Sequence, residues 1–545
     1  MRALLAALIA VTACSHPPVG ELRFRNQAPV WAVNDRAPLP KEPQYREYNR
    51  GLYHADGYVV RRMTRAMDKP PIRRAADTNS LDEVPNSTWF TNRIGVRDLT
   101  SAELRNGPNR QPGPFENFPW TIKKAKTGGT AIGFVFVDST GAQYLVKFDS
   151  LGRPEMESGA HAIVHRILWA CGYNVPEDYI GFIKRSDLKL APKATRETAG
   201  RKVPLTDQDL TTAFERIEKT SDGKMRVLAS RYLPGDVIGP YAREGTRGDD
   251  PNDKIPHQLR RSLRGQYPIF AWLNHTDLQE DNTLDTFENG HVVHYLIDFG
   301  NALGVMGTGL DTQTVGYTYR FDWEIAMKSL FTFGLWERPW EKIDDPKLRG
   351  IGLFEAKHFD PEEWHANSLY WPLEDKDRFD AFWGAKIMMR FTRADLKMIV
   401  DEAKFTNPRS AQYMLDTLVA RQRKTARIWF EKVAPLDKFA MVPSPNGPLF
   451  CFSDLLLTYK LDNPATMYEL TTFDREGHQT SKTRRIATSP SGNACVAGIE
   501  PSRTPDGYTI VRMRVYRDDH VLPETRVHLA YGADHKLDVI GLRRE

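Results

Sequence analysis

Three oxygen-bearing side chains occur close together in the middle of the chain, in an order that suits work on a phosphate. The stretch HTDLQEDN, residues 275–282, contains Asp277 and Asn282, and the tripeptide DFG places Asp298 shortly after it. Transfer of a phosphoryl group requires Mg²⁺ held by hard oxygen ligands, a carboxylate near the attacking hydroxyl, and a cation on the nucleotide phosphates. Lys147, in the run YLVKF, is a candidate for that cation.

The elements around these residues can be predicted from hydrophobic periodicity and turn signals. Three β runs joined by TGG and STG predict an antiparallel meander over residues 120–148, with Lys147 at the end of the third strand. Apolar residues at helical spacing predict a helix over 154–171, ended by Gly172, and another over 257–274. A hairpin over 282–299 follows the HTDLQEDN loop, so Asp298 is expected at the end of its second strand.

The order of these motifs resembles the protein-kinase-like superfamily. HTDLQEDN is similar to the catalytic loop H-R-D-L-x-x-x-N, with Thr276 in place of Arg, and DFG follows after a hairpin. Upstream, a Gly-rich turn, a strand with a lysine and a helix come in the kinase order. The resemblance covers roughly residues 120–435. It implies an α+β, two-lobed fold with an antiparallel β N-lobe and a mostly α C-lobe.

The resemblance also implies roles for single residues. It makes Asp277 the general base or hydroxyl-orienting carboxylate, and Asn282 and Asp298 the ligands of Mg²⁺. Lys147 would bind the phosphates of ATP; the alternative is an exposed strand lysine. On a helical wheel Glu157 lies at the edge of the apolar face and is the expected helix partner of Lys147, with Glu155 in reserve.

Other residues near the motifs are less specific. Gly128, Gly129 and Gly133 in TGGTAIG are candidates for a turn over the nucleotide, although the spacing is not G-x-G-x-x-G and any hairpin could use two glycines. Glu280 and Asp281 are interpreted as solvated loop charges.

Some features depart from the kinase pattern or compete with it. Thr276 cannot pair with a phosphorylated activation loop as Arg would, Gln279 replaces the usual Lys, and no A-P-E follows DFG. The chain therefore resembles atypical, secreted or small-molecule kinases more than signalling kinases. His161 and His165 in HAIVH are interpreted as a pair at the solvent edge of a helix, and zinc is rejected because no H-E-x-x-H frame is present.

The first residues, MRALLAALIAVTAC, have the form of an export signal. Arg2 precedes a short apolar run, and the approach to Cys14 resembles the lipobox of bacterial lipoproteins, in which the Cys is lipidated. The alternatives are a plain secretory signal and a buried N-terminal helix. No later segment reaches the roughly 18 to 20 apolar residues that a membrane span requires. The expected location is the bacterial cell envelope, with a lipid anchor in a membrane.

Composition and length set the remaining limits. At 545 residues the chain should hold several units, and 41% hydrophobic residues supply packed interiors. The net charge of +5, from 75 basic and 70 acidic residues, gives no support for a nucleic-acid partner. The predicted division is a signal peptide (1–13), an irregular extension (14–115), an N-lobe with a polar insertion at about 185–222 (116–240), a C-lobe (241–440) and a β domain (441–545).

The cysteines other than Cys14 give two expectations. Cys451 and Cys495 both lie in the β-rich C-terminal region, and an oxidising compartment would permit a disulfide between them. Cys171, at the end of an apolar helix, is interpreted as a buried thiol.

Two functions remain from the sequence. The first is an envelope-anchored phosphotransferase that moves a phosphoryl group from Mg-ATP to a hydroxyl on a protein, sugar or lipid. The second is a catalytically silent, pseudokinase-like lipoprotein that serves as a binding or scaffolding component. Export favours the second, since exported proteins meet little ATP. Retention of Asp277, both metal ligands and Lys147 favours the first.

Overall fold

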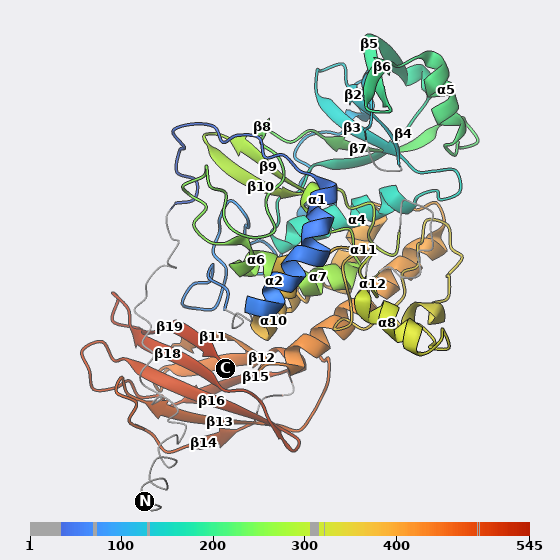
Figure 1. Ribbon diagram of the computed structural model, residues 1–545. Coiled ribbons are helices and arrows are strands. Elements are labelled where there is room, and N and C mark those ends of the chain that lie inside the picture. The colour runs from blue at the N-terminus through green and yellow to red at the C-terminus, as the bar shows by residue number, and fades with distance from the viewer. Residues whose placement is uncertain are drawn as a thin grey trace, which may run out of the picture. The chain divides into compact units, whose positions relative to one another are not determined.

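The structure is a computed structural model that contains both helices and strands, so the predicted α+β class is confirmed (Figure 1). It describes residues 34–68, 74–127, 131–305, 316–320, 322–487, 489 and 491–545. The chain divides into two units. We call Val30–Asp77 with Val84–Trp429 the large unit, and Thr78–Glu83 with Phe430–Glu545 the small unit.

A seven-stranded sheet forms one part of the large unit, in the order β4-β7-β3-β2-β1-β5-β6. The predicted meander is confirmed, because β1–β2 and β2–β3 pair antiparallel. Aromatic side chains such as Trp120, Phe136 and Phe148 fill the core on this sheet. The strands are β1 (Trp120–Ala125), β2 (Ile132–Val137), β3 (Gln143–Phe148), β4 (Asp178–Ile183), β5 (Leu188–Thr198), β6 (Arg201–Pro204) and β7 (Met225–Arg231).

The segment expected to be a polar insertion belongs to this sheet. β5 pairs parallel with β1, and β6 pairs antiparallel with β5 at the edge. The 3₁₀ turn η3 (Arg185–Asp187) precedes β5, and α5 (Asp207–Glu215) follows β6 with a capping box between Thr206 and Asp209. The sequence is polar here because both strands are largely exposed, with few buried positions.

Helix α4 (Met156–Cys171) follows β3 and ends at Gly172 as predicted. Gly172 has a positive φ of 129°, and an added Cβ would lie 2.2 Å from the ring of Phe90, so a side chain does not fit there.

The predicted helix over 257–274 is interrupted. It consists of a 3₁₀ turn η4 (His257–Leu259), α6 (Arg261–Arg264) and α7 (Gln266–Leu273). Pro268 lacks the N–H that a continuous helix would bond to Arg264, so a new helix has to begin just before it. The predicted hairpin is confirmed as β9 (Thr283–Glu288) and β10 (His291–Leu296), joined to β8 (Asp236–Val237) in a three-stranded sheet.

The segment predicted to be an irregular extension contains helices. A helical segment covers α1 (Arg50–Ala55), a π turn η1 (Asp56–Val60) and α2 (Arg61–Asp68). The side chain of Asn49 caps its start by accepting from the Leu52 N–H at 3.0 Å. Further on lie α3 (Ser101–Asn106), capped by Thr100, and a 3₁₀ turn η2 (Pro114–Glu116). Local capping and periodicity therefore outweigh the high content of Pro and Arg.

The rest of the large unit is mostly helical, as predicted. A 3₁₀ turn η5 (Glu280–Asn282) lies in the HTDLQEDN loop, and η6 (Pro339–Lys342) follows α8. The helices are α8 (Trp323–Phe331), α9 (Trp371–Glu374), α10 (Arg378–Met388), α11 (Arg393–Asp401) and α12 (Pro408–Glu431), the last of which extends into the small unit. Among the described residues, no helix has the length and apolar character needed to cross a bilayer.

The small unit is built mainly from strands and has its own core of buried side chains, including Phe450, Tyr468 and Val511. β11 (Leu436–Val442), β12 (Leu449–Asp454) and β15 (Asn493–Ala497) form one sheet. The other contains β13 (Thr466–Phe473), β14 (Arg484–Ile486), β16 (Thr509–Arg517), β17 (His520–Val521), β18 (Thr525–Tyr531) and β19 (Leu537–Arg544). A short helix, α13 (Leu455–Thr458), follows β12.

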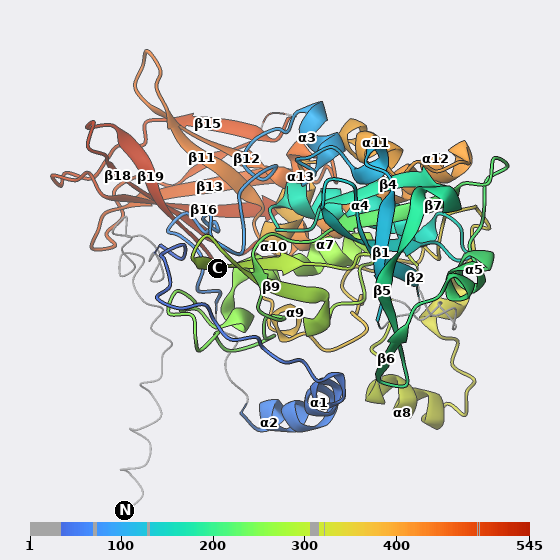
Figure 2. The same cartoon turned by 90° about the horizontal axis from the view of Figure 1, so that it is seen from above.

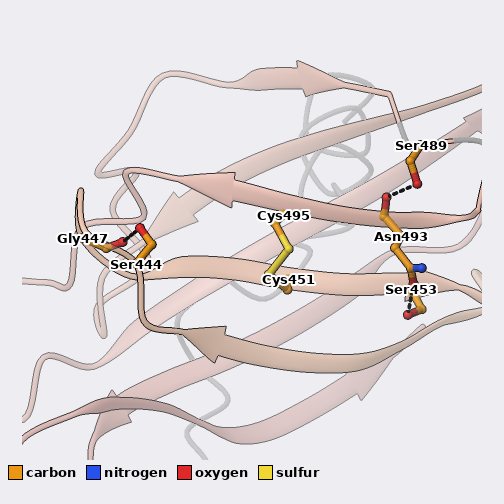
Figure 3. The surroundings of a disulfide bond; sticks show 7 residues. All are labelled: Ser444, Gly447, Cys451, Ser453, Ser489, Asn493 and Cys495. Atoms are coloured by element: carbon orange, nitrogen blue, oxygen red, sulfur yellow. Dashed lines mark hydrogen bonds between the residues drawn. A yellow bond between two sulfur atoms is a disulfide. The ribbon is translucent and has the colours of Figure 1, made fainter.

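A disulfide joins Cys451 and Cys495, which lie directly opposite each other on β12 and β15 (Figure 3). The sequence permitted this bond without requiring it. Cys171 is a buried free thiol, as predicted, and its burial raises its pKa.

Candidate functional site

Lys147 is the centre of a buried charge cluster. Its ammonium nitrogen Nζ lies 2.7 Å from Oδ1 of Asp298 and 3.6 Å from Oε1 of Glu157. Its side chain is 5% exposed, whereas that of Asp298 is 41% exposed. The lysine on β3, the glutamate on α4 and the aspartate after β10 therefore meet, although 151 residues separate the first from the last.

The electrostatics of the pair favour its charged form. Burial would lower the pKa of Lys147, but the carboxylates of Asp298 and Glu157 hold it above its ordinary value. Burial would likewise raise the pKa of Asp298, but Lys147 and His161 hold it well below its usual range. The site thus keeps a cation beside a partly exposed anion, which is the arrangement that binding a phosphate and a metal ion requires.

A second aspartate sets the position of Glu157 relative to Lys147. Asp149 follows β3 directly, and its carboxylate accepts the backbone N–H of Ser158 at 2.9 Å and that of Glu155 at 3.1 Å. It therefore caps the first turn of α4 from the end of the strand that holds Lys147. This contact explains why a strand lysine and a helix glutamate, ten residues apart in sequence, face each other.

His161, one turn further along α4, completes the cluster. Its Nδ1 lies 3.1 Å from the buried carboxylate of Asp178, and its Nε2 lies 3.4 Å from both Lys147 Nζ and Asp298 Oδ1. Burial and Lys147 would lower the pKa of His161, but Asp178 and Asp298 raise it. The predicted position of HAIVH at a solvent edge is wrong: His161 and His165 are buried, because α4 lies inside the large unit.

The loop HTDLQEDN holds Asp277 with three neighbours. Gln279 donates to its Oδ1 at 2.8 Å, Asn301 donates to its Oδ2 at 2.8 Å, and Nη2 of Arg320 lies 3.7 Å away. The side chain is 14% exposed. The carboxylate is therefore held in one orientation but can still be reached from outside.

Asn282 links this loop to Asp298. Its amide nitrogen donates to the backbone carbonyl of Asp277 at 2.6 Å, which leaves its side-chain oxygen for another partner. Its backbone carbonyl accepts the N–H of Ile297, the residue before Asp298, at 3.0 Å. Asn282 is thus bonded to Asp277 and, through Ile297, to the backbone next to Asp298, although Asp298 lies two residues beyond β10 rather than within it.

Two buried rings support the two motifs. His275 packs edge-on against Phe299, with ring centroids 5.8 Å apart, and burial lowers the pKa of His275 to about 4. Phe299 is fully buried, while Asp298 has a positive φ of 60° that turns its side chain out of the strand direction. The apolar contact anchors the DFG tripeptide while its carboxylate stays accessible.

Glu157, His161 and Asp298 are placed so that a metal ion could bind between them. Lys147 Nζ already lies within 3.6 Å of a ligand atom of each, so its ammonium stands where such an ion would bind. A better-suited set is Asp298 with Asn282, since both offer an oxygen. Asp281, the residue before Asn282, has an Oδ1 that is buried without a hydrogen-bond partner among the described residues. An orphaned acidic oxygen at this point fits a hard cation.

The structure shows which of the two candidate glutamates contacts Lys147. Glu157 contacts the lysine, whereas Glu155 accepts from Arg349 Nε at 2.8 Å and from the Thr406 hydroxyl at 2.6 Å. Gly133 lies opposite Lys147 in the β2–β3 pair, where an added Cβ would be 2.7 Å from the Val146 carbonyl. The close approach of the neighbouring strand β3 thus explains why residue 133 is a glycine. Gly128 and Gly129, and likewise Cys14, lie outside the described residues.

The interpretation of Glu280 as a solvated charge is wrong. Its carboxylate binds Arg46 Nη2 at 2.7 Å and the backbone N–H of Arg243 at 2.8 Å, and it is almost fully buried. Asp281 is half-buried, and its burial raises its pKa. Arg46 lies more than 200 residues from the loop in sequence, so a local pattern could not reveal this pair.

Four residues of the site were missed by sequence reasoning: Asn301, Arg320, His161 and Asp178. Asn301 directly follows DFG, and this adjacency is the only signal that could have found it. His161 was considered only as a partner of His165. Arg320 and Asp178 carry no local signal, because they reach the site through the tertiary fold.

No family model matches this chain, and no curated protein matches it either. Among solved structures, it is similar to the Golgi casein kinase with Mn/ADP bound, at 12% identity over 60% of this chain and 74% of that one, with a TM-score of 0.29. A second structure of the Golgi casein kinase covers 60% of this chain and 73% of that one, at 12% identity and a TM-score of 0.28. These similarities are too weak to carry an argument about function.

Proposed function

We propose that this protein is a phosphotransferase with a two-lobed, kinase-like large unit that moves a phosphoryl group from Mg-ATP to a hydroxyl acceptor. The observation that carries the proposal is the set of bonds that brings the motifs together: Lys147 bonds Asp298, and Asn282 bonds both Asp277 and Ile297, the residue before Asp298. A buried cation, two metal-binding oxygens and an accessible carboxylate are the parts that this chemistry needs.

The roles follow from the positions. Lys147 would bind the phosphates of the nucleotide, with Glu157 and the capped α4 keeping it in place. Asp298 and Asn282 would hold Mg²⁺, which supplies neutralisation of the phosphate charge when bound. Asp277, oriented by Gln279 and Asn301, would take the proton of the acceptor hydroxyl. The oxygen of that hydroxyl would then bond to the γ-phosphorus of ATP, and the bond from this phosphorus to the leaving ADP would break.

A silent, pseudokinase-like binding protein is the second candidate, and one observation favours it. The Lys147 ammonium bonds Asp298 directly at 2.7 Å, so the lysine and a metal ion would compete for the same carboxylate. The two candidates differ in whether nucleotide and metal displace that contact.

We further propose that the protein is exported and held in the bacterial cell envelope by a lipid on Cys14. The support is the lipobox-like approach to this cysteine. Metabolic labelling with a fatty acid tests it: the unaltered chain should incorporate label, and the Cys14→Ala chain should not.

Thermal unfolding with Mg²⁺ and ATP tests the nucleotide site. At a concentration about 100 times the dissociation constant, a ligand adds about 2.7 kcal/mol to the free energy of unfolding. We expect a clear rise in melting temperature that is lost in Asp298→Ala and kept in Asp98→Ala, a control whose side chain is 96% exposed. No rise with the unaltered protein would exclude the phosphotransferase.

Release of radiolabelled phosphate from ATP, with water or an envelope fraction as acceptor, tests the chemistry. Removal of a positioned general base lowers rates by roughly 10²- to 10⁴-fold. Asp277→Ala should therefore release phosphate at least about 100-fold more slowly while keeping the ATP-dependent rise in melting temperature. Equal release by both forms would remove Asp277 from this role, and binding without any release would establish the silent candidate.

A further inference from the structure

Two segments of the large unit expose apolar side chains on one helix face each. Of the 21 large apolar side chains exposed in the described part of the chain, five lie in residues 50–68 and six in residues 323–335. We call these eleven the apolar face: Leu52, Val59, Val60, Met63, Met67, Trp323, Met327, Leu330, Phe331, Phe333 and Leu335. Such a concentration is unusual for a surface that meets only water.

The helical segment 50–68 is attached to the large unit by its polar side. Arg61 binds Glu244, Arg65 binds Asp375 and lies over the ring of Trp371, and Tyr53 is buried and donates to the Leu369 carbonyl at 3.0 Å. A surface helix normally buries its apolar side and exposes its charges. Here polar and charged contacts hold the helix in place, and the apolar side points away from the protein.

Helix α8 shows the same feature more strongly. None of its residues is buried, and its exposed Trp323, Met327, Leu330 and Phe331 recur at helical spacing. The turn that follows adds Phe333, whose side chain is 91% exposed. Apolar side chains exposed to this extent would be stabilised by transfer out of water.

The two segments lie on one side of the large unit. Cζ of Arg62, on α2, is 5.8 Å from the ring of Tyr319, four residues before α8. Figure 2 shows α1, α2 and α8 along the same lower edge of the large unit, and in Figure 1 α1 and α2 lie toward the viewer. They can therefore meet one common surface.

We propose that the apolar face docks on an anionic phospholipid bilayer. Helices that expose Leu, Val, Met, Phe or Trp along one side lie in the interface of such a bilayer, with that side among the acyl chains. Segment 50–68 contains four arginines against two aspartates. Arg61 and Arg65 bind carboxylates of the large unit, whereas Arg50 is exposed and suits anionic headgroups. The segment also begins 36 residues after Cys14, so a lipid on that cysteine would keep the face near a membrane.

Docking would bring Asp277 to the lipid surface. Arg320, which lies 3.7 Å from Asp277, precedes α8 by three residues, and His54 of α1 is within electrostatic reach of the same carboxylate. The docking itself does not depend on the proposed phosphotransfer, but one consequence rests on it: the acceptor hydroxyl would be presented at the bilayer surface.

Hydrogen–deuterium exchange of the full chain tests the docking without any assay of activity. Vesicles of phosphatidylglycerol and phosphatidylethanolamine should slow amide exchange in residues 50–68 and 323–335 by about tenfold or more, because burial in the interface suppresses local opening. The strands of the small unit should exchange as before. The chain carrying Phe331→Glu and Phe333→Glu should lose this protection in both segments.

Val96→Glu is the matched control, since Val96 is 67% exposed but lies outside both segments. It should keep the protection. Unchanged exchange in the presence of vesicles would overturn the proposal. So would protection that depends on protein concentration and not on lipid, which would assign the face to a second copy of the chain. Equal protection by neutral phosphatidylcholine would overturn the choice of an anionic surface.

Discussion

At the scale of single residues, the site depends on polar side chains that fix other side chains. Asn301 and Gln279 hold the two oxygens of Asp277, and Asp178 holds the ring of His161 against Asp298. Each of these contacts uses one hydrogen-bonding group whose loss would remove one partner from a buried or partly buried carboxylate or imidazole. The reactive groups are therefore oriented before any ligand arrives.

A buried aspartate away from the site should control stability in acid. Asp253 accepts from His257 Nε2 and Arg260 Nη2, both at 2.7 Å, and from the Arg247 N–H at 2.7 Å. Burial would raise its pKa, but His257 and Arg260 hold it well below the ordinary value. A carboxylate with a depressed pKa stabilises the fold above its unfolded pKa of about 3.9, and this contribution is lost as pH falls toward the folded value.

Asp253→Asn should therefore lower the free energy of unfolding at neutral pH by about 3–5 kcal/mol, the loss seen when one partner of a buried pair is removed. It should also flatten the decline in stability below about pH 4. Denaturant unfolding at several pH values measures both effects. Asp207→Asn, at a side chain that is 75% exposed, is the control and should change neither. If the free energy of unfolding falls as steeply below about pH 4 in Asp253→Asn as in the unaltered chain, Asp253 does not control stability in acid.

At the scale of elements, the connection between β3 and α4 decides the geometry of the cluster. Asp149 accepts two backbone N–H groups and the hydroxyl of Ser158 at the start of α4. The strand end thus acts as the helix cap, and the strand and helix keep Lys147 opposite Glu157. The periodicity of the sequence indicated which glutamate faces inward, because a helix of regular pitch fixes the phase of every side chain.

Asp149→Asn should weaken the helix cap and the response to nucleotide together. Loss of a cap costs about 1–2 kcal/mol. We expect a lower melting temperature and a smaller rise with Mg²⁺ and ATP, both measured by calorimetry. Asp209→Asn weakens the matching cap of α5, which is not part of the cluster, and should lower the melting temperature without reducing the response to nucleotide. An unchanged response in Asp149→Asn would show that α4 is positioned by its packing alone.

At the scale of the whole molecule, the two units have separate cores and should respond to separate treatments. The sheet of the large unit and the sheets of the small unit are each filled by their own buried side chains. The disulfide Cys451–Cys495 lies in the small unit, and the proposed nucleotide site lies in the large one. A treatment that changes the stability of one core should therefore shift the unfolding transition of that unit first.

Calorimetry should show two transitions with independent shifts. Reduction of the disulfide, which spans 44 residues, removes about 4 kcal/mol of stability from the small unit by the loop-entropy relation. Mg²⁺ with ATP should raise only the transition of the large unit. The Cys451→Ser, Cys495→Ser chain is the control for the reductant, because its transitions should not respond to it. One transition that moves with both treatments would mean that the units unfold together.

The sequence by itself determined the meander, the α4 helix with its inward Glu157, the hairpin before DFG and the mostly helical character of the later part of the large unit. These features depend on periodicity, caps and turns within a few residues. Only the tertiary structure decided the burial of His161, the pairing of Glu280 with Arg46, the contact of Asn301 with Asp277, and the outward direction of the apolar side chains in 50–68. Each of these depends on which distant segment lies against it, and local periodicity carries no record of a neighbour that is far away along the chain.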